Sequence, residues 1–173
     1  GGSYAENIKL TVRTPSLTRL AGTKIGDAAA YEGVFSGDAK KFALNGSVDV
    51  RNAELAGYGL SRLSGPLGLE AKDQTYTVKG QLAGAGGTTK GVIGGLLGSS
   101  PRLNLTASRL NDGNILLQDV DLKGSALNLT GSGRRNLMGG LSFNADFDVN
   151  NIGVIKHGAR GRFGGKLRGS MPR

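Results

Sequence analysis

Residues 41–51 read KFALNGSVDVR, the longest regular alternation of apolar and polar residues in the first half of the chain. Apolar side chains or glycine occupy every second position, at Phe42, Leu44, Gly46, Val48 and Val50. Side chains of a β-strand point alternately to the two faces of its sheet, so these residues share one face and the polar residues between them share the other. The stretch therefore predicts a strand with one apolar and one polar face.

The same alternation recurs along most of the chain, which predicts an all-β protein. It is seen in residues 8–12, 67–71, 76–82, 103–107, 120–122, 127–129 and 141–149. Turn residues separate several of these runs, as in NDGN at 111–114 and KDQ at 72–74. Ser64-Gly65-Pro66 predicts a strand boundary, because proline can begin a strand but is excluded from its centre. The pattern indicates about ten strands in a long antiparallel meander.

Glycine punctuates these runs and predicts a strongly curved sheet. The chain has 31 glycines and only four prolines, which is unlike collagen or a simple linker. Many glycines follow a Leu-x-Gly step, as at Gly46, Gly124 and Gly131. Glycine within a strand weakens it but permits bulges, bends and close approach of the backbone. Repeated along a meander, the step favours a sheet that curls.

Two short segments depart from the alternation and predict one or two short helices. In the first, Thr14 can cap a helix near residues 15–21 and Pro15 suits its first position. In the second, near residues 89–99, Val92, Ile93, Leu96 and Leu97 fall on one helical face. Four glycines share that segment, so its intrinsic helix propensity is low.

The residues that catalysis requires are scarce. The absence of cysteine excludes disulfides, thiol catalysis and cysteine-bound zinc. The single histidine, His157, is interpreted as an exposed polar residue, and no phosphate-binding loop motif is present. The carboxylates at 119 and 121, and at 146 and 148, fall on the polar faces of their strands. We therefore expect no enzyme activity, no metal site and no cofactor.

The net charge of +9 leaves nucleic acid, anionic lipid headgroups and acidic proteins as possible partners. Residues 133–173 hold eight Lys and Arg against two Asp, so the excess is concentrated there. A nucleic-acid surface normally adds aromatic stacking platforms, and Phe163 stands alone among these cations. The basic tail (Lys156, Arg160, Arg162, Lys166 and Arg168) therefore favours a solvated strand face or a headgroup contact.

Several stretches together resemble the TamB family of the AsmA-like superfamily, the inner-membrane subunit of the translocation and assembly module. They are the glycine-rich apolar segment that ends at Ser99-Ser100-Pro101, RLNLTA at 102–107 and DLKGSALNLTG at 121–131, set in a glycine-punctuated meander. The resemblance covers most of residues 4–173. Gly1-Gly2-Ser3 is interpreted as a tag or linker remnant, and residues 4–173 as one domain, a fragment of the C-terminal region of a longer protein.

The resemblance implies an inner-membrane anchor and a periplasmic location in a Gram-negative bacterium. It implies a U-shaped β-sheet, the β-taco, whose apolar groove carries phospholipid acyl chains or unfolded outer-membrane protein strands, with a TamA-like barrel as partner. No catalytic motif is carried over. The groove-lining role is assigned to the alternating apolar positions Ile8, Leu10, Val12, Leu44, Val48, Val50, Leu67, Leu69, Val78, Leu82, Leu103, Leu105, Leu127, Leu129, Leu141, Phe143 and Phe147.

Two other interpretations stay open at the level of sequence. A close-packed β-sandwich acting as a structural or protein-binding module needs the same one apolar face per strand. A basic β domain that binds nucleic acid is compatible with the net charge.

For nucleic acid we expect only weak binding without sequence preference, because attraction to phosphate alone gives that behaviour. Anisotropy titrations with labelled DNA should show a steep loss of affinity between about 50 and 200 mM salt. A complex that survives the higher salt and prefers one sequence contradicts this expectation.

Overall fold

The computed structural model describes residues 7–14, 26–55 and 57–171 and shows an all-β protein. The strands in this part of the chain are β1 (Ile8–Thr14), β2 (Ala28–Gly37), β3 (Lys41–Leu55), β4 (Tyr58–Lys72), β5 (Thr75–Ala85), β6 (Arg102–Arg109), β7 (Ile115–Lys123), β8 (Leu127–Arg135), β9 (Leu141–Val149) and β10 (Phe163–Met171). A short helix α1 (Gly91–Leu97) joins β5 to β6, and a 3-10 turn η1 (Ile152–Val154) joins β9 to β10.

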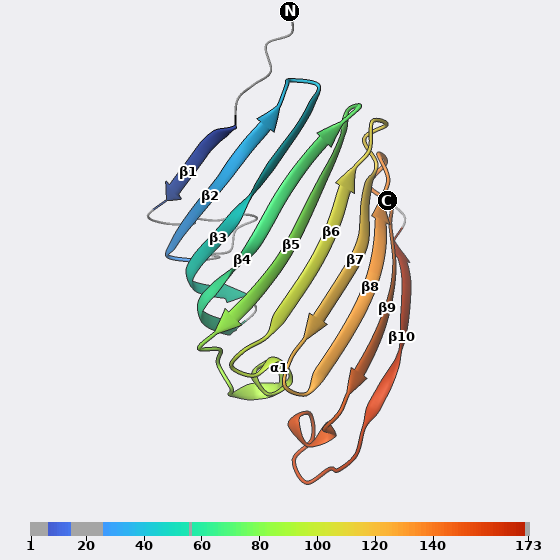
Figure 1. The fold of residues 1–173 in the computed structure, drawn as a ribbon. Coiled ribbons are helices and arrows are strands. Elements are labelled where there is room, and N and C mark those ends of the chain that lie inside the picture. The colour runs from blue at the N-terminus through green and yellow to red at the C-terminus, as the bar shows by residue number, and fades with distance from the viewer. Residues whose placement is uncertain (1–6, 15–25, 56, 172–173) are drawn as a thin grey trace, which may run out of the picture.

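All ten strands form one antiparallel sheet in sequence order, from β1 to β10. The meander is open, with β1 and β10 as its two edges, and every pairing joins strands that are consecutive in the chain. The sheet twists and curls into a U, so that β1–β5 are seen face-on and β8–β10 nearly edge-on (Figure 1). The predicted all-β fold with a curled antiparallel sheet is thus confirmed.

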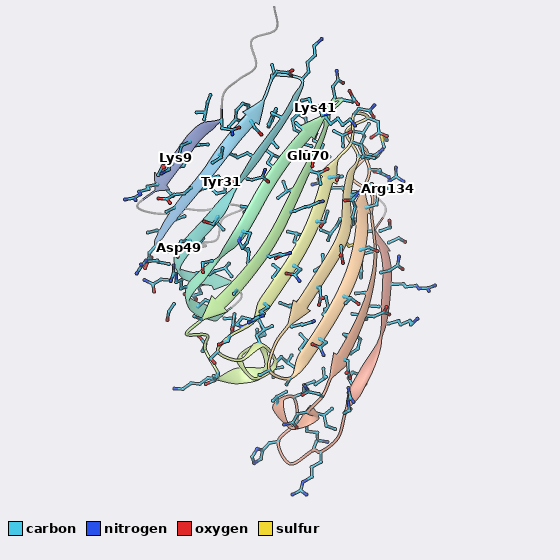
Figure 2. All side chains as sticks on the ribbon, in the orientation of Figure 1. Lys9, Tyr31, Lys41, Asp49, Glu70 and Arg134 are labelled. Carbon is cyan, nitrogen blue, oxygen red and sulfur yellow. The ribbon has the colours of Figure 1, made fainter. Side chains whose placement is uncertain are left out.

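The strand register separates an apolar inner face from a polar outer face. Cross-strand partners lie on the same face, so one inner row can be followed across the whole sheet: Leu10, Gly33, Gly46, Leu67, Gly80, Leu105, Val120, Gly131, Ala145 and Leu167. The outer face carries the charges, including Lys9, Lys41, Asp49, Glu70 and Arg134 (Figure 2).

Glycines in this inner row let neighbouring strands come close where the sheet curls. A Cβ at Gly46 would lie 2.1 Å from the carbonyl oxygen of Glu32 and 2.5 Å from the Cα of Gly33. No side chain fits there, so the close approach of β2 and β3 requires glycine. The ring of Tyr31 covers Gly33, and its hydroxyl donates to the carbonyl of Leu67 at 2.9 Å, which ties β2 to β4 across the inner face.

Two irregularities change which residues face inward. Arg51 and Asn52 are both exposed, as are Ser61 and Arg62 opposite them, so the alternation of β3 and β4 changes phase here. Asn52 has a φ of +49°, the left-handed conformation that Asn tolerates better than most residues. In β7 the register shifts between Leu117 and Val120, which keeps both side chains on the inner face.

The boundary predicted at Ser64-Gly65-Pro66 was wrong, because β4 runs through it. Pro66 pairs with Ser47 of β3, while the pairing of β4 with β5 is interrupted between Ser64 and Leu67. Gly65 has a φ of +152°. The strand can hold a proline at its centre because the ladder to β5 is broken at this point.

The helix predicted near residues 89–99 is confirmed as α1, and the one near 15–21 lies outside the described residues. The turn predicted at 111–114 joins β6 to β7, with the Asn114 amide donating to Asp112 at 2.9 Å. The 3-10 turn η1 was not predicted. It begins where the side chain of Asn151 accepts a hydrogen bond from the amide of Gly153.

Gly46→Ala should destabilise the protein by about 1–3 kcal/mol, because the added methyl group meets the backbone of β2. Each kcal/mol lowers Tm by roughly 2–4 °C in a protein of this size. The control is Gly80→Ala in the same inner row, where the nearest atom is the movable end of Leu67 at 3.2 Å. Thermal melts in which both variants unfold at the same temperature would contradict the assigned role of Gly46.

Candidate functional site: the apolar groove

The inner face of the sheet is the candidate site, and it contains all seventeen residues assigned to a groove by sequence. Pairing joins them across strands, for example Leu44 to Leu69 and Leu69 to Val78. Their placement on one face is therefore established by the register, and their role in binding remains a prediction. The register adds apolar neighbours from every part of the sheet, among them Tyr31, Phe35, Phe42, Tyr76, Leu117, Val120, Leu122, Phe163, Leu167 and Met171.

Two strands of this face were not recognised in the sequence. In β2, Tyr31, Gly33 and Phe35 do alternate, but the alanines around them and the outward-facing Val34 weaken the pattern. In β10, glycine occupies every second inner position between Phe163, Leu167 and Met171. Counting glycine as an inner-face residue reveals both strands.

No second layer packs on the inner face within the described residues. Not one large side chain of the described residues is fully buried, and few apolar side chains are buried at all, among them Tyr58, Ala71, Ala126 and Val149. Inner-face side chains near the sheet edges are widely exposed, at 55% for Ile8 and 51% for Leu167. A close-packed sandwich buries such residues, so the sandwich interpretation does not hold for this part of the chain.

Aromatic side chains line the groove in two groups. The rings of Phe35 and Phe42 lie 5.3 Å apart, and that of Tyr76 lies 6.5 Å from Phe42. In β9 the ring of Phe147 lies 5.5 Å from Phe163. The rings of Phe143 and Phe147 cover Gly169 and Gly165 on β10, an arrangement that protects glycines within a sheet from water.

The helix α1 is anchored where the strands end at the β3–β4 and β7–β8 turns. We call this end of the sheet the helix edge, as distinct from the edge strands β1 and β10 (Figure 1). On one side the Tyr58 hydroxyl donates to the carbonyl of Gly98 at 2.5 Å. On the other, the carbonyls of Leu96 and Leu97 accept hydrogen bonds from the amides of Ala126 and Ser125. These contacts satisfy the C-terminal carbonyls and hold a helix whose glycines give it little stability of its own.

An apolar pocket of about 250 Å³ lies where α1 meets the inner face. It is lined by Ala53, Glu54, Tyr58, Leu60, Leu63, Leu97, Pro101, Arg102, Leu103 and Leu122. A dry apolar cavity of about 150 Å³ is enough to bind benzene. This pocket therefore has room for a short segment of hydrocarbon.

The hydroxyls that organise the groove stay protonated at neutral pH. Burial raises the pKa of Tyr58 and of Tyr31 above the ordinary tyrosine value. Both therefore act as hydrogen-bond donors toward backbone carbonyls. Their hydrogen bonds connect β2 to β4 and β4 to the end of α1 without placing a charge in the groove.

Some of the charged side chains on the outer face form exposed pairs. Arg62 makes two hydrogen bonds to Asp49, at 3.0 and 2.8 Å, and this contact lowers the pKa of the Asp49 carboxyl. Asp148 pairs with Arg162 at 2.5 Å. In the part of the chain that the structure describes, no three His, Asp or Glu side chains gather as metal ligands.

Val48→Arg and Leu105→Arg should leave the protein folded, because both positions are half-buried and a long Arg side chain can reach water from an open groove. We expect each to lower Tm by a few degrees, from a loss of about 1 kcal/mol of apolar burial. The control is Val149→Arg on the same face, where the side chain is only 3% exposed. A buried unpaired charge costs several kcal/mol, so this variant should unfold. Circular dichroism melts in which all three unfold would show that the inner face is closed.

No helix among the described residues is long and apolar enough to cross a membrane. A scan against protein-family models, a search of curated proteins and a search of solved structures each found no match. What the groove can bind therefore follows from its shape and its lining residues.

Proposed function

We propose that the groove holds extended apolar chains, first of all the acyl chains of phospholipids, and that the protein is a carrier and not an enzyme. The observation that carries this proposal is an apolar face that continues over ten strands with no second layer on it within the described residues. Exposed apolar surface of this extent marks a binding site in soluble proteins.

The chemistry of the lining suits acyl chains. Leu, Val, Ile, Phe and glycine make up nearly all of the inner face, and each methylene group that leaves water contributes about 0.8 kcal/mol. Glycines in the central inner row let neighbouring strands and side chains come close, as at Gly46 and Gly33. Arg109 and Arg135 are the only charged residues that the register places on this face within the described strands, and both lie at the strand ends opposite α1. A ligand with a long apolar part and a polar end fits this distribution.

We propose further that the chain is the groove segment of an inner-membrane-anchored, TamB-like protein in the periplasm of a Gram-negative bacterium. There it would pass phospholipid toward the outer membrane or, with a TamA-like barrel, support the assembly of outer-membrane proteins. The curled open sheet supports this proposal because it is the fold that the resemblance implies.

Unfolded outer-membrane protein strands are the second candidate ligand, and the open sheet edges favour it. Within the described residues, β1 and β10 stand at the two ends of the strand order, each next to a single strand of the sheet. An added strand can bond to such an edge through its main chain and place alternate apolar side chains on the inner face. The two ligands compete for the same surface and are separable by experiment.

The test is to purify the protein from bacteria without detergent and to identify its bound molecules by mass spectrometry of organic extracts. We expect co-purified phospholipid, reduced severalfold in the double variant Val48→Arg/Leu105→Arg. The control is Ser47→Arg/Thr106→Arg, which adds the same charge to adjacent outer-face positions and should retain lipid. Wild-type protein without lipid that binds apolar alternating peptides would favour the second candidate. Equal lipid in both double variants would contradict binding in the groove.

A further inference from the structure

The β8–β9 turn, residues 136–140, displays two large apolar side chains to solvent. Leu137 is 70% exposed and Met138 is 69% exposed, and Met171 at the end of the neighbouring β10 is 60% exposed. These are the three largest exposed fractions among the large apolar residues that the structure describes. All three lie at the end of the sheet opposite α1, where the β2–β3, β4–β5, β6–β7 and β8–β9 turns lie (Figure 1). We call this end the hairpin edge.

The turn holds this pair outward by its own hydrogen bonds. The amide of Gly140 donates to the side chain of Asn136 at 2.8 Å, and the amide of Asn136 donates to the carbonyl of Gly140 at 3.0 Å. The side chain of Leu137 lies over Gly113 of the neighbouring β6–β7 turn, where a Cβ would come within 2.5 Å of it. The apolar pair is thus presented on a closed turn that rests on its neighbour.

Three arginines lie at the strand ends next to this turn. Arg134 and Arg135 end β8 just before the turn, and Arg109 ends β6 on the inner face beside Ile115. The carboxylate near them is Asp112, whose two oxygens accept hydrogen bonds from the amide and the side chain of Asn114. Among the described residues, Arg109 and Arg135 form no ion pair with a carboxylate. Their guanidinium groups are therefore available to an external anion, while Arg134 also acts on Asp112.

We infer that this part of the hairpin edge is a docking surface for an anionic lipid bilayer, with Leu137 and Met138 entering the interface and Arg109, Arg134 and Arg135 contacting lipid phosphates. Apolar side chains next to Arg and Lys are the composition that binds the boundary between headgroups and acyl chains. A guanidinium group can bind two oxygens of one phosphate at once, and it is more weakly hydrated than an ammonium group. Each basic residue near an anionic surface contributes attraction that salt screens.

A bilayer suits this surface better than a folded protein partner does. A stable protein interface needs a broad and complementary patch, whereas here two protruding side chains stand on a narrow turn among cations. The inference differs from the proposed function in the residues that carry it, because Leu137 and Met138 lie on the turn outside the inner face, although Arg109 and Arg135 also stand at the end of that face.

The experiment is flotation of the purified protein with vesicles of neutral phosphatidylcholine, with and without anionic phosphatidylglycerol. We expect binding to the anionic vesicles that falls as salt rises. Leu137→Ser/Met138→Ser should weaken this binding at least tenfold. Arg134→Gln/Arg135→Gln should weaken it by about 30-fold and remove the preference for anionic lipid.

Two control variants carry matched changes elsewhere and should bind within about twofold of wild type. Val92→Ser/Ile93→Ser removes two exposed apolar side chains from α1 at the helix edge. Lys166→Gln/Arg168→Gln removes two charges from the outer face of β10. If either control abolishes flotation while the turn variants bind normally, the docking surface lies elsewhere and the inference is overturned. Flotation that fails for wild type overturns it as well.

A label reports the contact directly, because the chain contains no cysteine of its own. A polarity-sensitive fluorophore on Leu137→Cys should shift to the blue when anionic vesicles are added, and the same fluorophore on Ile93→Cys should not. Equal shifts at both positions, or no shift at 137, would contradict the assigned surface. Lipid extraction from Leu137→Ser/Met138→Ser separates the two proposals, since this variant keeps every inner-face residue and loss of docking should leave its bound lipid unchanged.

Discussion

The structure depends on one constraint, an apolar sheet face that no second layer covers within the described residues. Ten strands place Leu, Val, Ile and Phe side chains on the same side of the sheet. Exposing these apolar side chains to water is unfavourable. A flat sheet would leave this face entirely in water. Inner-face side chains of nearby strands pack on one another, as in the Phe35–Phe42–Tyr76 and Phe147–Phe163 groups, and this packing removes part of the apolar area from solvent. The remaining exposed area is what makes the face available to a ligand.

Glycine and α1 determine how far the curling goes. At Gly46 the backbone of β2 leaves no space for a Cβ, so glycine permits the approach, while Tyr31 bonds across it to β4. At the helix edge, α1 is held by Tyr58 on one side and by the β7–β8 turn on the other, with an apolar pocket beside it. The inner-face side chains stay half-buried because no second layer covers them within the described residues.

The alternation of side chains was enough to predict the fold class, the strand order and the face on which each groove residue lies, because a period of two is the direct signature of a sheet. The helix α1 was predicted despite its glycines, since its four apolar residues share one face. The boundary at Pro66 was wrong because the break in the β4–β5 ladder that tolerates proline has no local sequence signal. The inward positions of Arg109 and Arg135 were missed for a related reason: each follows a regular run, and only the register shows that it continues the apolar face. Whether that face is open or covered depends on the arrangement of the whole sheet, which periodicity does not report.

The most direct test of an open, ligand-holding groove is a scan of photo-crosslinking residues along β6, placed singly at positions 103 to 107 in bacteria. Leu103, Leu105 and Ala107 face inward, while Asn104 and Thr106 face outward. The account predicts crosslinks to lipid acyl chains with a period of two, at 103, 105 and 107 and not at 104 or 106. Crosslinks that are absent at every position, or equally strong at all five, would contradict it.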